Sequence, residues 1–240
     1  QYHNHSKWRA NCLDAMMASD GMETWLSNRH RLDDVYLGRD HNAAIDGALK
    51  AAPGITRHGG NPAEAAVQHI AGGKAGAIYS QRMEFGPRAL GARTILGSPA
   101  DHAINDTLNQ RLERSEFMPF APVVKEERAG EVFEVSDLNA YACRFMTITC
   151  AVNPAWQDRI PAVVHVDGTA RPQVIRRDDN PLYHDILDGF ERETGLPVLI
   201  NTSFNVHEEP IVDTPDHCLR ALADDRIDFV VTEEALYTRD

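Results

Sequence analysis

Amphipathic helices are repeatedly predicted directly before short apolar runs, and this order constrains the fold more than any other feature of the chain. Three helix starts carry a capping residue followed by proline at the first helical position, where its missing N–H costs nothing: Asn61, Asn180 and Thr214. The apolar runs that follow have the length of buried strands: residues 75–79, 197–200 and 227–231. Because helices and strands are mixed without strict alternation, we predict an α/β fold, bordering on α+β, with a mixed sheet.

Other local patterns predict several further elements. Helices are expected at residues 40–50 and 103–112, and strands at 145–150, 162–166, 171–175 and 235–237. The segment 117–124 is apolar but carries two prolines, so we expect only residues 120–124 to join the sheet, at its edge.

An arginine-rich stretch directly follows the apolar run at residues 75–79. Its charged side chains and first glycine are Arg82, Glu84, Gly86, Arg88 and Arg93. Gly86 is followed by a proline, which predicts a short helix whose N-terminus faces this loop. Backbone N–H groups at a helix N-terminus and guanidinium groups together favour an anion such as phosphate or carboxylate. The alternative is a surface arginine cluster that is paired with Glu84 and other acids.

The apolar run at residues 197–200 leads directly into a polar segment, Asn201, Thr202, Ser203, Phe204 and Asn205. In α/β sheets, ligands bind at the C-terminal edge of the strands. Hydroxyl and amide groups at that edge can bond a phosphate, a ribose or a carbamoyl-type amide without adding charge. The alternative is a turn in which these side chains bond their own backbone.

The overall charge argues against two classes of partner. The formal net charge is −12, so we expect no binding to nucleic acid or to a membrane surface by the whole chain. No apolar run approaches about 18 residues, and no segment resembles a signal peptide. The four cysteines lack metal-ligand spacing and are interpreted as reduced, which suits a cytoplasmic protein: Cys12, Cys143, Cys150 and Cys218.

The N-terminal residues differ in character from the rest of the chain. Residues 1–34 are interpreted as a polar extension or a remnant of a preceding domain, and residues 35–240 as one domain. His3 and His5 have no further spaced ligands, so we predict no metal site there. The chain begins with Gln1 rather than methionine, from which we expect it to be a fragment of something longer.

Four ordered motifs together resemble the C-terminal domain of the O-carbamoyltransferase family, which includes nodulation-protein and antibiotic-biosynthesis enzymes. The motifs are residues 82–93, residues 120–122, residues 165–173, and residues 199–205 with 209–212. The resemblance covers roughly Val35 to Asp240, and the first thirty-odd residues add nothing to it.

The resemblance implies one half of a two-part enzyme. In that family, an N-terminal actin-like domain of the ATPase type, with an iron site, transfers a carbamoyl group to a hydroxyl. The C-terminal half has a YrdC-like fold, a twisted mixed sheet flanked by helices. It forms carbamoyl-adenylate from ATP and carbamoyl phosphate. The resemblance therefore implies that this chain is the C-terminal half and does not complete the transfer alone.

The same resemblance implies the residues of the site. The residues expected to act in catalysis are Arg88, Arg171, Ser203 and Asn205. Those expected to bind substrate or nucleotide are Arg82, Glu84, Gly86, Arg93, Arg114, Gln173, Asn201 and Thr202. Adenylation builds negative charge at phosphorus and expels pyrophosphate, and fixed guanidinium groups stabilise that charge. ATP is expected to bring Mg²⁺.

The chain departs from the family pattern at two cations. Many members read Lys-x-Arg-Glu-x-Phe-Arg-Pro-Phe where this chain has Leu112 and Met118 in place of the lysine and the second arginine. Arg114 is retained, and Arg111 is a candidate to compensate. The alternative function is therefore a module that binds nucleotide or carbamoyl phosphate, or acts as a scaffold, without catalysis.

Overall fold

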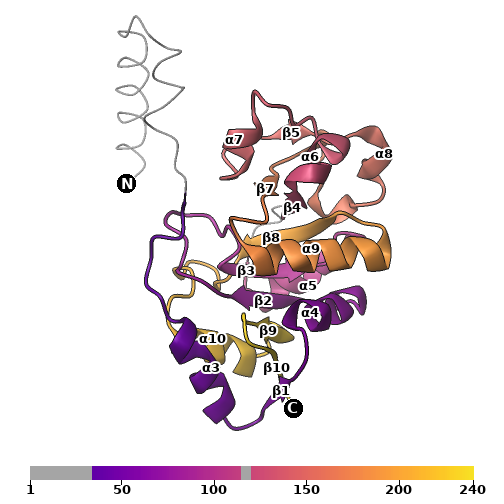
Figure 1. The fold of residues 1–240 in the computed structure, drawn as a ribbon. Coiled ribbons are helices and arrows are strands. Elements are labelled where there is room, and N and C mark those ends of the chain that lie inside the picture. The colour runs from indigo at the N-terminus through magenta and orange to yellow at the C-terminus, as the bar shows by residue number, and fades with distance from the viewer. Residues whose placement is uncertain (1–33, 115–119) are drawn as a thin grey trace, which may run out of the picture. The chain divides into compact units, whose positions relative to one another are not determined.

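An eight-stranded mixed sheet forms the centre of the protein, in the strand order β1-β10-β9-β2-β3-β8-β4-β7 (Figure 1). The computed structural model describes residues 34–114 and 120–240, so predictions for residues 1–33 and for Met118 lie outside the described residues. The strands are β1 (Ile55–His58), β2 (Gly76–Tyr79), β3 (Arg93–Gly97), β4 (Ala121–Lys125), β7 (Gln173–Ile175), β8 (Val198–Ser203), β9 (Phe229–Val231) and β10 (Leu236–Arg239). The pairs β2–β9 and β4–β7 are parallel and the others antiparallel, which confirms the predicted mixed α/β fold.

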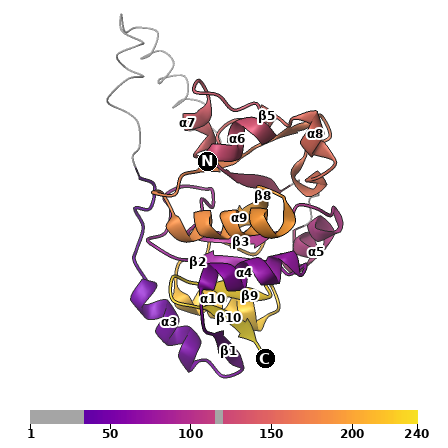
Figure 2. The ribbon, with the colours of Figure 1, turned by 45° about the vertical axis from the view of Figure 1, so that its right-hand side comes forward.

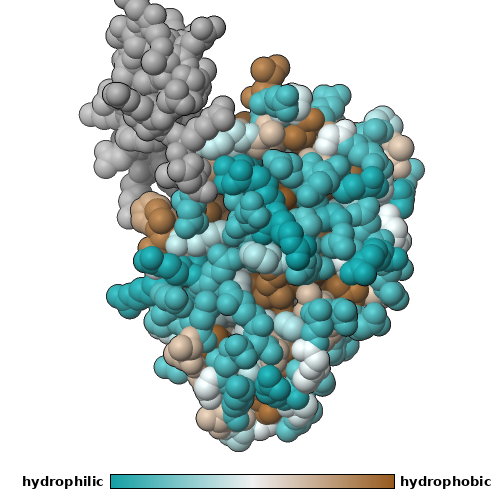
Figure 3. Space-filling view, viewed as in Figure 1, coloured by the Kyte–Doolittle hydropathy of each residue, from teal (hydrophilic) through white to brown (hydrophobic). Residues whose placement is uncertain are grey.

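Helices flank the sheet, and α4 and α9 lie side by side against it (Figures 1 and 2). The longer helices are α3 (Asn42–Ala51), α4 (Pro62–Ala71), α5 (Ala103–Arg111), α6 (Glu126–Val132), α9 (Pro181–Thr194) and α10 (Pro215–Ala223). The face that includes α4 and α9 is largely hydrophilic, with small hydrophobic areas between polar side chains (Figure 3). Within the described ranges, no helix has the length and apolar character needed to cross a membrane.

The helix starts predicted at Asn61, Asn180 and Thr214 are confirmed, and in the first two the side chain of the capping residue accepts hydrogen bonds from the helix. The side chain of Asn61 accepts hydrogen bonds from Ala63 N and Glu64 N at the start of α4. Asn180 Oδ1 accepts from Tyr183 N at the start of α9. Helix α9 ends at Gly195, whose φ of 73° is a left-handed conformation that glycine adopts without a steric penalty.

The three apolar runs become the buried strands β2, β8 and β9. Strand β2 is buried along its whole length between β9 and β3, and β8 is buried through Asn201 between β3 and β4. The sequence run of β8 therefore has two parts in one strand. Its apolar start belongs to the core, and its polar end reaches the rim of the sheet.

Two predicted strands, at residues 145–150 and 162–166, are wrong. They fall in a group of short elements that gathers beyond the β4–β7 end of the sheet (Figure 1), namely α7 (Ala140–Cys143), β5 (Cys150–Ala151), α8 (Pro154–Gln157), η1 (Pro161–Val163) and β6 (Thr169–Ala170). Met146 has a positive φ of 54°, which interrupts an extended chain before β5 begins. A 3₁₀ turn starts at Pro161, so Ala162 and Val163 are buried without forming a strand, and the run ends at Val166, which is exposed.

The edge position predicted for residues 120–124 is also wrong. Strand β4 lies between β8 and β7, so it has a neighbour on each side. The pairing with β7 begins only at Val123, whereas Pro122 pairs with Ile200 of β8 alone. A proline is tolerated there because β4 has one partner strand at that position.

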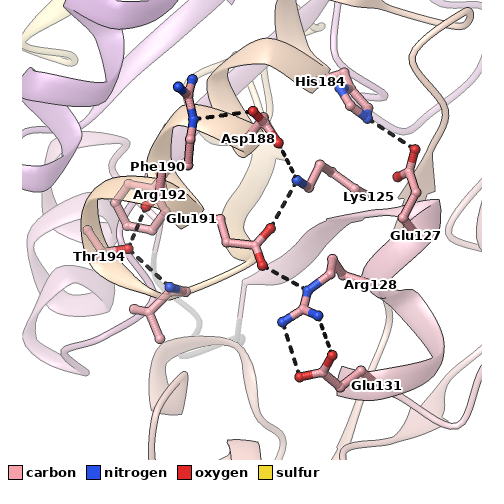
Figure 4. Close-up of polar contacts among 11 residues, drawn as sticks. Lys125, Glu127, Arg128, Glu131, His184, Asp188, Phe190, Glu191, Arg192 and Thr194 are labelled. Atoms are coloured by element: carbon pink, nitrogen blue, oxygen red, sulfur yellow. Dashed lines mark hydrogen bonds and ion pairs between the residues drawn. The ribbon is translucent and has the colours of Figure 1, made fainter.

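An ion-pair network fixes the far end of β4 to α6 and α9 (Figure 4). Lys125 is only 7% exposed, and its Nζ lies 2.7 Å from Asp188 and 2.9 Å from Glu191. Arg128 contacts the other oxygen of Glu191 at 2.8 Å. Burial alone would lower the pKa of Lys125, but the hydrogen bonds from its ammonium to Asp188 and Glu191 raise it overall. The bond from Lys125 lowers the pKa of Asp188.

Lys125→Met is expected to lower the free energy of unfolding at neutral pH by about 1–2 kcal/mol, because two carboxylates lose their shared cation. Asp188 has a lowered pKa when folded, so its stabilisation is present above about pH 4 and is lost as the pH falls. Lys125 has a raised pKa, so its contribution is lost only as the pH rises above about 10.4.

Denaturant unfolding of Lys125→Met and the parent at several pH values checks this prediction. The stability difference should be constant between about pH 5 and pH 10 and should shrink below about pH 4. The control is Lys74→Met, which removes an exposed lysine 3.8 Å from Asp228 and should cost under about 0.5 kcal/mol. Equal losses for the two variants would contradict the prediction.

Candidate anion-binding site

A cavity of about 250 Å³ lies at the polar end of β8. The lining residues that the sequence had singled out are Arg88, Arg114, Arg171, Asn201, Thr202, Ser203 and Asn205. They come from the arginine-rich loop, the segment after α5, the link between β6 and β7, and the end of β8 with the loop that follows it. The structure thus brings together residues that are more than a hundred positions apart, because β8 pairs with both β3 and β4.

Arg114 is the most firmly held of the cavity arginines. Its Nη1 donates to Thr202 Oγ1 at 2.8 Å, and its Nη2 donates to the carbonyl of Ser203 at 3.3 Å. Burial lowers the pKa of its guanidinium. Arg114 forms no ion pair among the described residues, so a partly desolvated positive charge is held against neutral oxygens at the cavity wall.

Arg88 and Arg171 bring two further positive charges to the same cavity. No carboxylate of the described chain forms an ion pair with either residue, and the buried Nε of Arg171 lacks a hydrogen-bond partner there. Burial lowers the pKa of Arg171, and the positive charge of Arg88 lowers it further. Two like charges that lack acidic partners favour an anion between them.

Ser203 and Asn205 line the cavity, and their side chains also form hydrogen bonds within their own loop. Ser203 Oγ donates to Asn205 Oδ1 at 2.6 Å, while Asn205 Nδ2 donates to the carbonyls of Val206 and Glu209. The alternative interpretation of this segment, a turn whose side chains bond their own backbone, therefore holds for Asn205. Ser203 Oγ still has acceptor capacity toward the cavity.

Four predicted residues of the arginine-rich loop do not line the cavity: Arg82, Glu84, Gly86 and Arg93. Arg82 instead donates to the carbonyls of Leu37 and Gly38. Arg93 is fully buried in β3, where its Nη1 donates to the carbonyls of Ser80 and Ala92. Its guanidinium carbon lies 3.6 Å from the centre of the Tyr79 ring.

The short helix predicted after Gly86 is absent, because a buried carboxylate organises the loop instead. Glu84 is 2% exposed, and its Oε1 accepts hydrogen bonds from the N–H groups of Leu90, Ala92 and Arg93 at 2.6, 3.3 and 3.2 Å. Gly86 has a φ of 128°, which is not helical. The protein therefore supplies its own anion to the N–H groups of this loop.

Gln173, the last of the predicted residues, lies behind the cavity wall rather than on it. Its Nε2 donates to the carbonyl of Leu90 at 2.6 Å, and its Oε1 accepts from Asn201 Nδ2 at 2.7 Å. Gln173 therefore links the arginine-rich loop to β8.

Sequence reasoning missed four polar or polarisable residues of the cavity: Asn109, Met146, His207 and Glu208. Asn109 lies in α5, where only the apolar face of the helix carried a signal. Met146 belongs to the region predicted as a strand. His207 and Glu208 follow the Ser203–Asn205 element, and their place in a loop left no periodic pattern to indicate their direction.

Comparisons with known proteins agree on one family. A family model described as the carbamoyltransferase C-terminus matches residues 67–239. An uncharacterized protein of Methanocaldococcus jannaschii is 41% identical over 177 residues, which are 73% of this chain and 28% of that protein. The nodulation protein NolO of Bradyrhizobium diazoefficiens is 37% identical over 208 residues, 85% of this chain and 38% of that protein. This chain thus spans about a quarter to two fifths of the length of these relatives.

A solved structure shares the fold. Full-length HypF in its phosphate- and nucleotide-bound form superposes with a TM-score of 0.52 at 18% sequence identity, covering 78% of this chain and 22% of that chain. At this identity the likeness concerns the fold alone.

Proposed function

The chain belongs to the family of carbamoyltransferase C-terminal domains, and on that basis we propose that it binds ATP and carbamoyl phosphate and forms carbamoyl-adenylate. The observation that carries the proposal is the convergence of Arg88, Arg114 and Arg171 on one cavity, without an acidic partner among the described residues. Phosphate groups are the anions that such a cluster of guanidinium groups suits best. HypF, which shares the fold, has been solved with phosphate and a nucleotide bound, and we propose the same class of ligand for this chain.

The proposed chemistry needs no nucleophilic side chain. Water releases phosphate from carbamoyl phosphate, and an oxygen of the resulting carbamate attacks the α-phosphorus of ATP while pyrophosphate leaves. Arg88 and Arg171 would bind the phosphates, and Arg114 would stabilise the charge that develops beside Ser203. Guanidinium groups that are already in place stabilise this charge without reorganisation.

Mg²⁺ would enter with ATP. Glu208 is the carboxylate among the described residues that line the cavity. Mg²⁺ bound to nucleotide phosphates keeps several waters and needs only one or two protein carboxylates, so this donor set fits the ion. Mg²⁺ would neutralise part of the phosphate charge, and Glu208 would orient it through a carboxylate oxygen.

Partners and location complete the proposal. The family resemblance implies that the carbamoyl group would pass to an acceptor hydroxyl in an N-terminal actin-like domain that contains iron. The relatives are long enough to contain a further domain of this kind. Nucleic acid and membranes are not partners in this proposal, given the net charge of −12. A cytoplasmic location stays a prediction.

One observation favours the second candidate, a binding module without catalysis. Leu112, in place of a family lysine, is buried in the core and does not line the cavity. Arg111 does not compensate, because its guanidinium pairs with Asp228 at 3.1 Å. The cavity therefore lacks one cation of the family pattern, which would weaken phosphate binding or slow the reaction.

Arg88→Ala is expected to weaken ATP binding by about tenfold to hundredfold, since it removes charge-assisted contacts at an exposed rim. Calorimetric titration with ATP and Mg²⁺, with and without carbamoyl phosphate, measures the change. Arg177→Ala is the matched control, because that exposed arginine pairs with Asp185 outside the cavity. Equal affinity of Arg88→Ala and the parent would refute the site. Pyrophosphate release by the parent separates the enzyme from the binding module.

A further inference from the structure

Asn201 lies in the wall of the cavity with its amide orientation fixed. The residue is 1% exposed, yet it lines the cavity. Its Nδ2 donates to the carbonyl of Ala89 at 3.1 Å and to Gln173 Oε1 at 2.7 Å. A side-chain amide nitrogen has two hydrogens, and both therefore have oxygen acceptors.

The orientation of Gln173 is fixed in turn. Its Nε2 donates to the carbonyl of Leu90, which can only accept. Its Oε1 must therefore face Asn201 and accept from Nδ2. If the Asn201 amide were turned around, its oxygen would face two acceptors, Gln173 Oε1 and the Ala89 carbonyl. The two amides and the two loop carbonyls thus determine each other's direction.

The other polar atom of the Asn201 side chain, the amide oxygen Oδ1, is buried and receives no hydrogen bond among the described residues. A buried acceptor that stays unsatisfied costs about 1–3 kcal/mol, so proteins rarely keep one without a use. The described contacts of Nδ2 are all uncharged, with the Met146 sulfur 3.4 Å away, and the arginines that line the same cavity would repel a cation. The site therefore suits a neutral N–H donor better than an ammonium group.

We propose that Asn201 determines specificity for the carbamoyl group, with Oδ1 accepting a hydrogen bond from the carbamoyl NH₂ and Gln173 acting as its positioning residue. This inference rests on the proposed function, because it concerns the same cavity. The cavity of about 250 Å³ is small, which favours the carbamoyl and phosphate groups as the contacts of this wall. An acetyl group has the same shape but presents a methyl group, which cannot donate a hydrogen bond.

A purely structural role for Asn201 makes a different prediction. If its only task is to hold the Ala89 carbonyl against β8, replacement should lower stability and weaken all ligands alike. If Oδ1 recognises the carbamoyl group, replacement should remove the preference for carbamoyl phosphate over acetyl phosphate. Sites built to bond a substrate N–H or O–H strongly reject analogues that lack it.

The test compares the affinities of carbamoyl phosphate, acetyl phosphate and inorganic phosphate for the whole chain, by calorimetric titration of each one without nucleotide. The parent should prefer carbamoyl phosphate to acetyl phosphate by about tenfold or more. Asn201→Leu should bring the two affinities within about twofold while inorganic phosphate binds as before. Gln173→Leu frees the Asn201 amide to rotate, so it should reduce the preference in part; it also serves if Asn201→Leu does not fold.

Each outcome separates the inference from the proposed function. A parent that binds both acyl phosphates equally overturns the role of Asn201 and leaves the phosphate site intact. A preference that survives in Gln173→Leu and Asn201→Leu also overturns it. A parent that binds none of the phosphates refutes the proposed function itself, and the inference with it.

Discussion

Glu84→Ala is expected to lower the free energy of unfolding by about 3 kcal/mol or more. The carboxylate is buried and accepts hydrogen bonds from the N–H groups of Leu90, Ala92 and Arg93. Without it, these groups have no acceptor at the buried end of the loop, and each unsatisfied donor costs about 1–3 kcal/mol. For a domain of this size, the melting temperature should fall by about 6–12 °C.

Thermal and denaturant unfolding measure this effect, with two matched variants. Glu84→Gln keeps an uncharged acceptor in place and should lose less stability than Glu84→Ala. Glu64→Ala removes an exposed glutamate from the first turn of α4 and should cost about 0.5 kcal/mol or less. A loss below about 1 kcal/mol in Glu84→Ala would contradict the role of this carboxylate in organising the loop.

Arg114→Leu is expected to weaken ATP binding by about a hundredfold or more, a larger effect than at the exposed Arg88. Its guanidinium is partly desolvated, holds Thr202 and Ser203 in place, and lacks an anionic partner among the described residues. A phosphate would therefore meet a pre-positioned charge. This prediction depends on the proposed function.

Arg114→Lys tests whether geometry matters as well as charge. A lysine ammonium is a single centre on a flexible stem and cannot reproduce the fork that reaches both Thr202 Oγ1 and the Ser203 carbonyl. We expect about tenfold weaker ATP binding in calorimetry. Arg159→Leu is the control, since that arginine stacks on Trp156 and donates to Gly195 outside the cavity. Wild-type affinity in both Arg114 variants would rule the residue out of the site.

The parts of the fold that local sequence determines were predicted correctly. Asn61 and Asn180 each accept hydrogen bonds from the helix that follows, so the signal and its cause lie within three residues. The apolar runs of β2, β8 and β9 have the length and composition of buried strands, and they are buried inside the sheet. In these elements, the sequence pattern reflects the same local interactions, helix capping and apolar burial, that form the structure.

The wrong predictions concern segments whose conformation depends on distant contacts. The arginine-rich loop carries the sequence signal of a helix start, but the Glu84 carboxylate competes for the N–H groups. The apolar run at 145–150 has the composition of a strand, yet the positive φ of Met146 and its place in the cavity wall follow from packing. No local pattern reports such contacts.

The cavity residues show the same difference between positions with a local sequence signal and positions whose direction depends on distant contacts. Residues at the end of β8 were found because polar side chains directly follow a buried strand. Arg93 was assigned to ligand binding because it lies in an arginine-rich motif, but it pairs opposite Tyr79 in the sheet and is buried there. The direction of the Arg93 side chain depends on the register between β2 and β3, which the sequence does not state.

The separation of the cavity residues along the chain bears on how the protein is made. The described lining runs from Pro87 to Glu208, and β8 is the strand that joins the two sides. While a nascent chain on the ribosome ends before β8, β3 and β4 lack the strand between them, and the arginines face no closed pocket. Translation products that end before β8 therefore have exposed strand edges, which favour aggregation, and they lack the closed cavity.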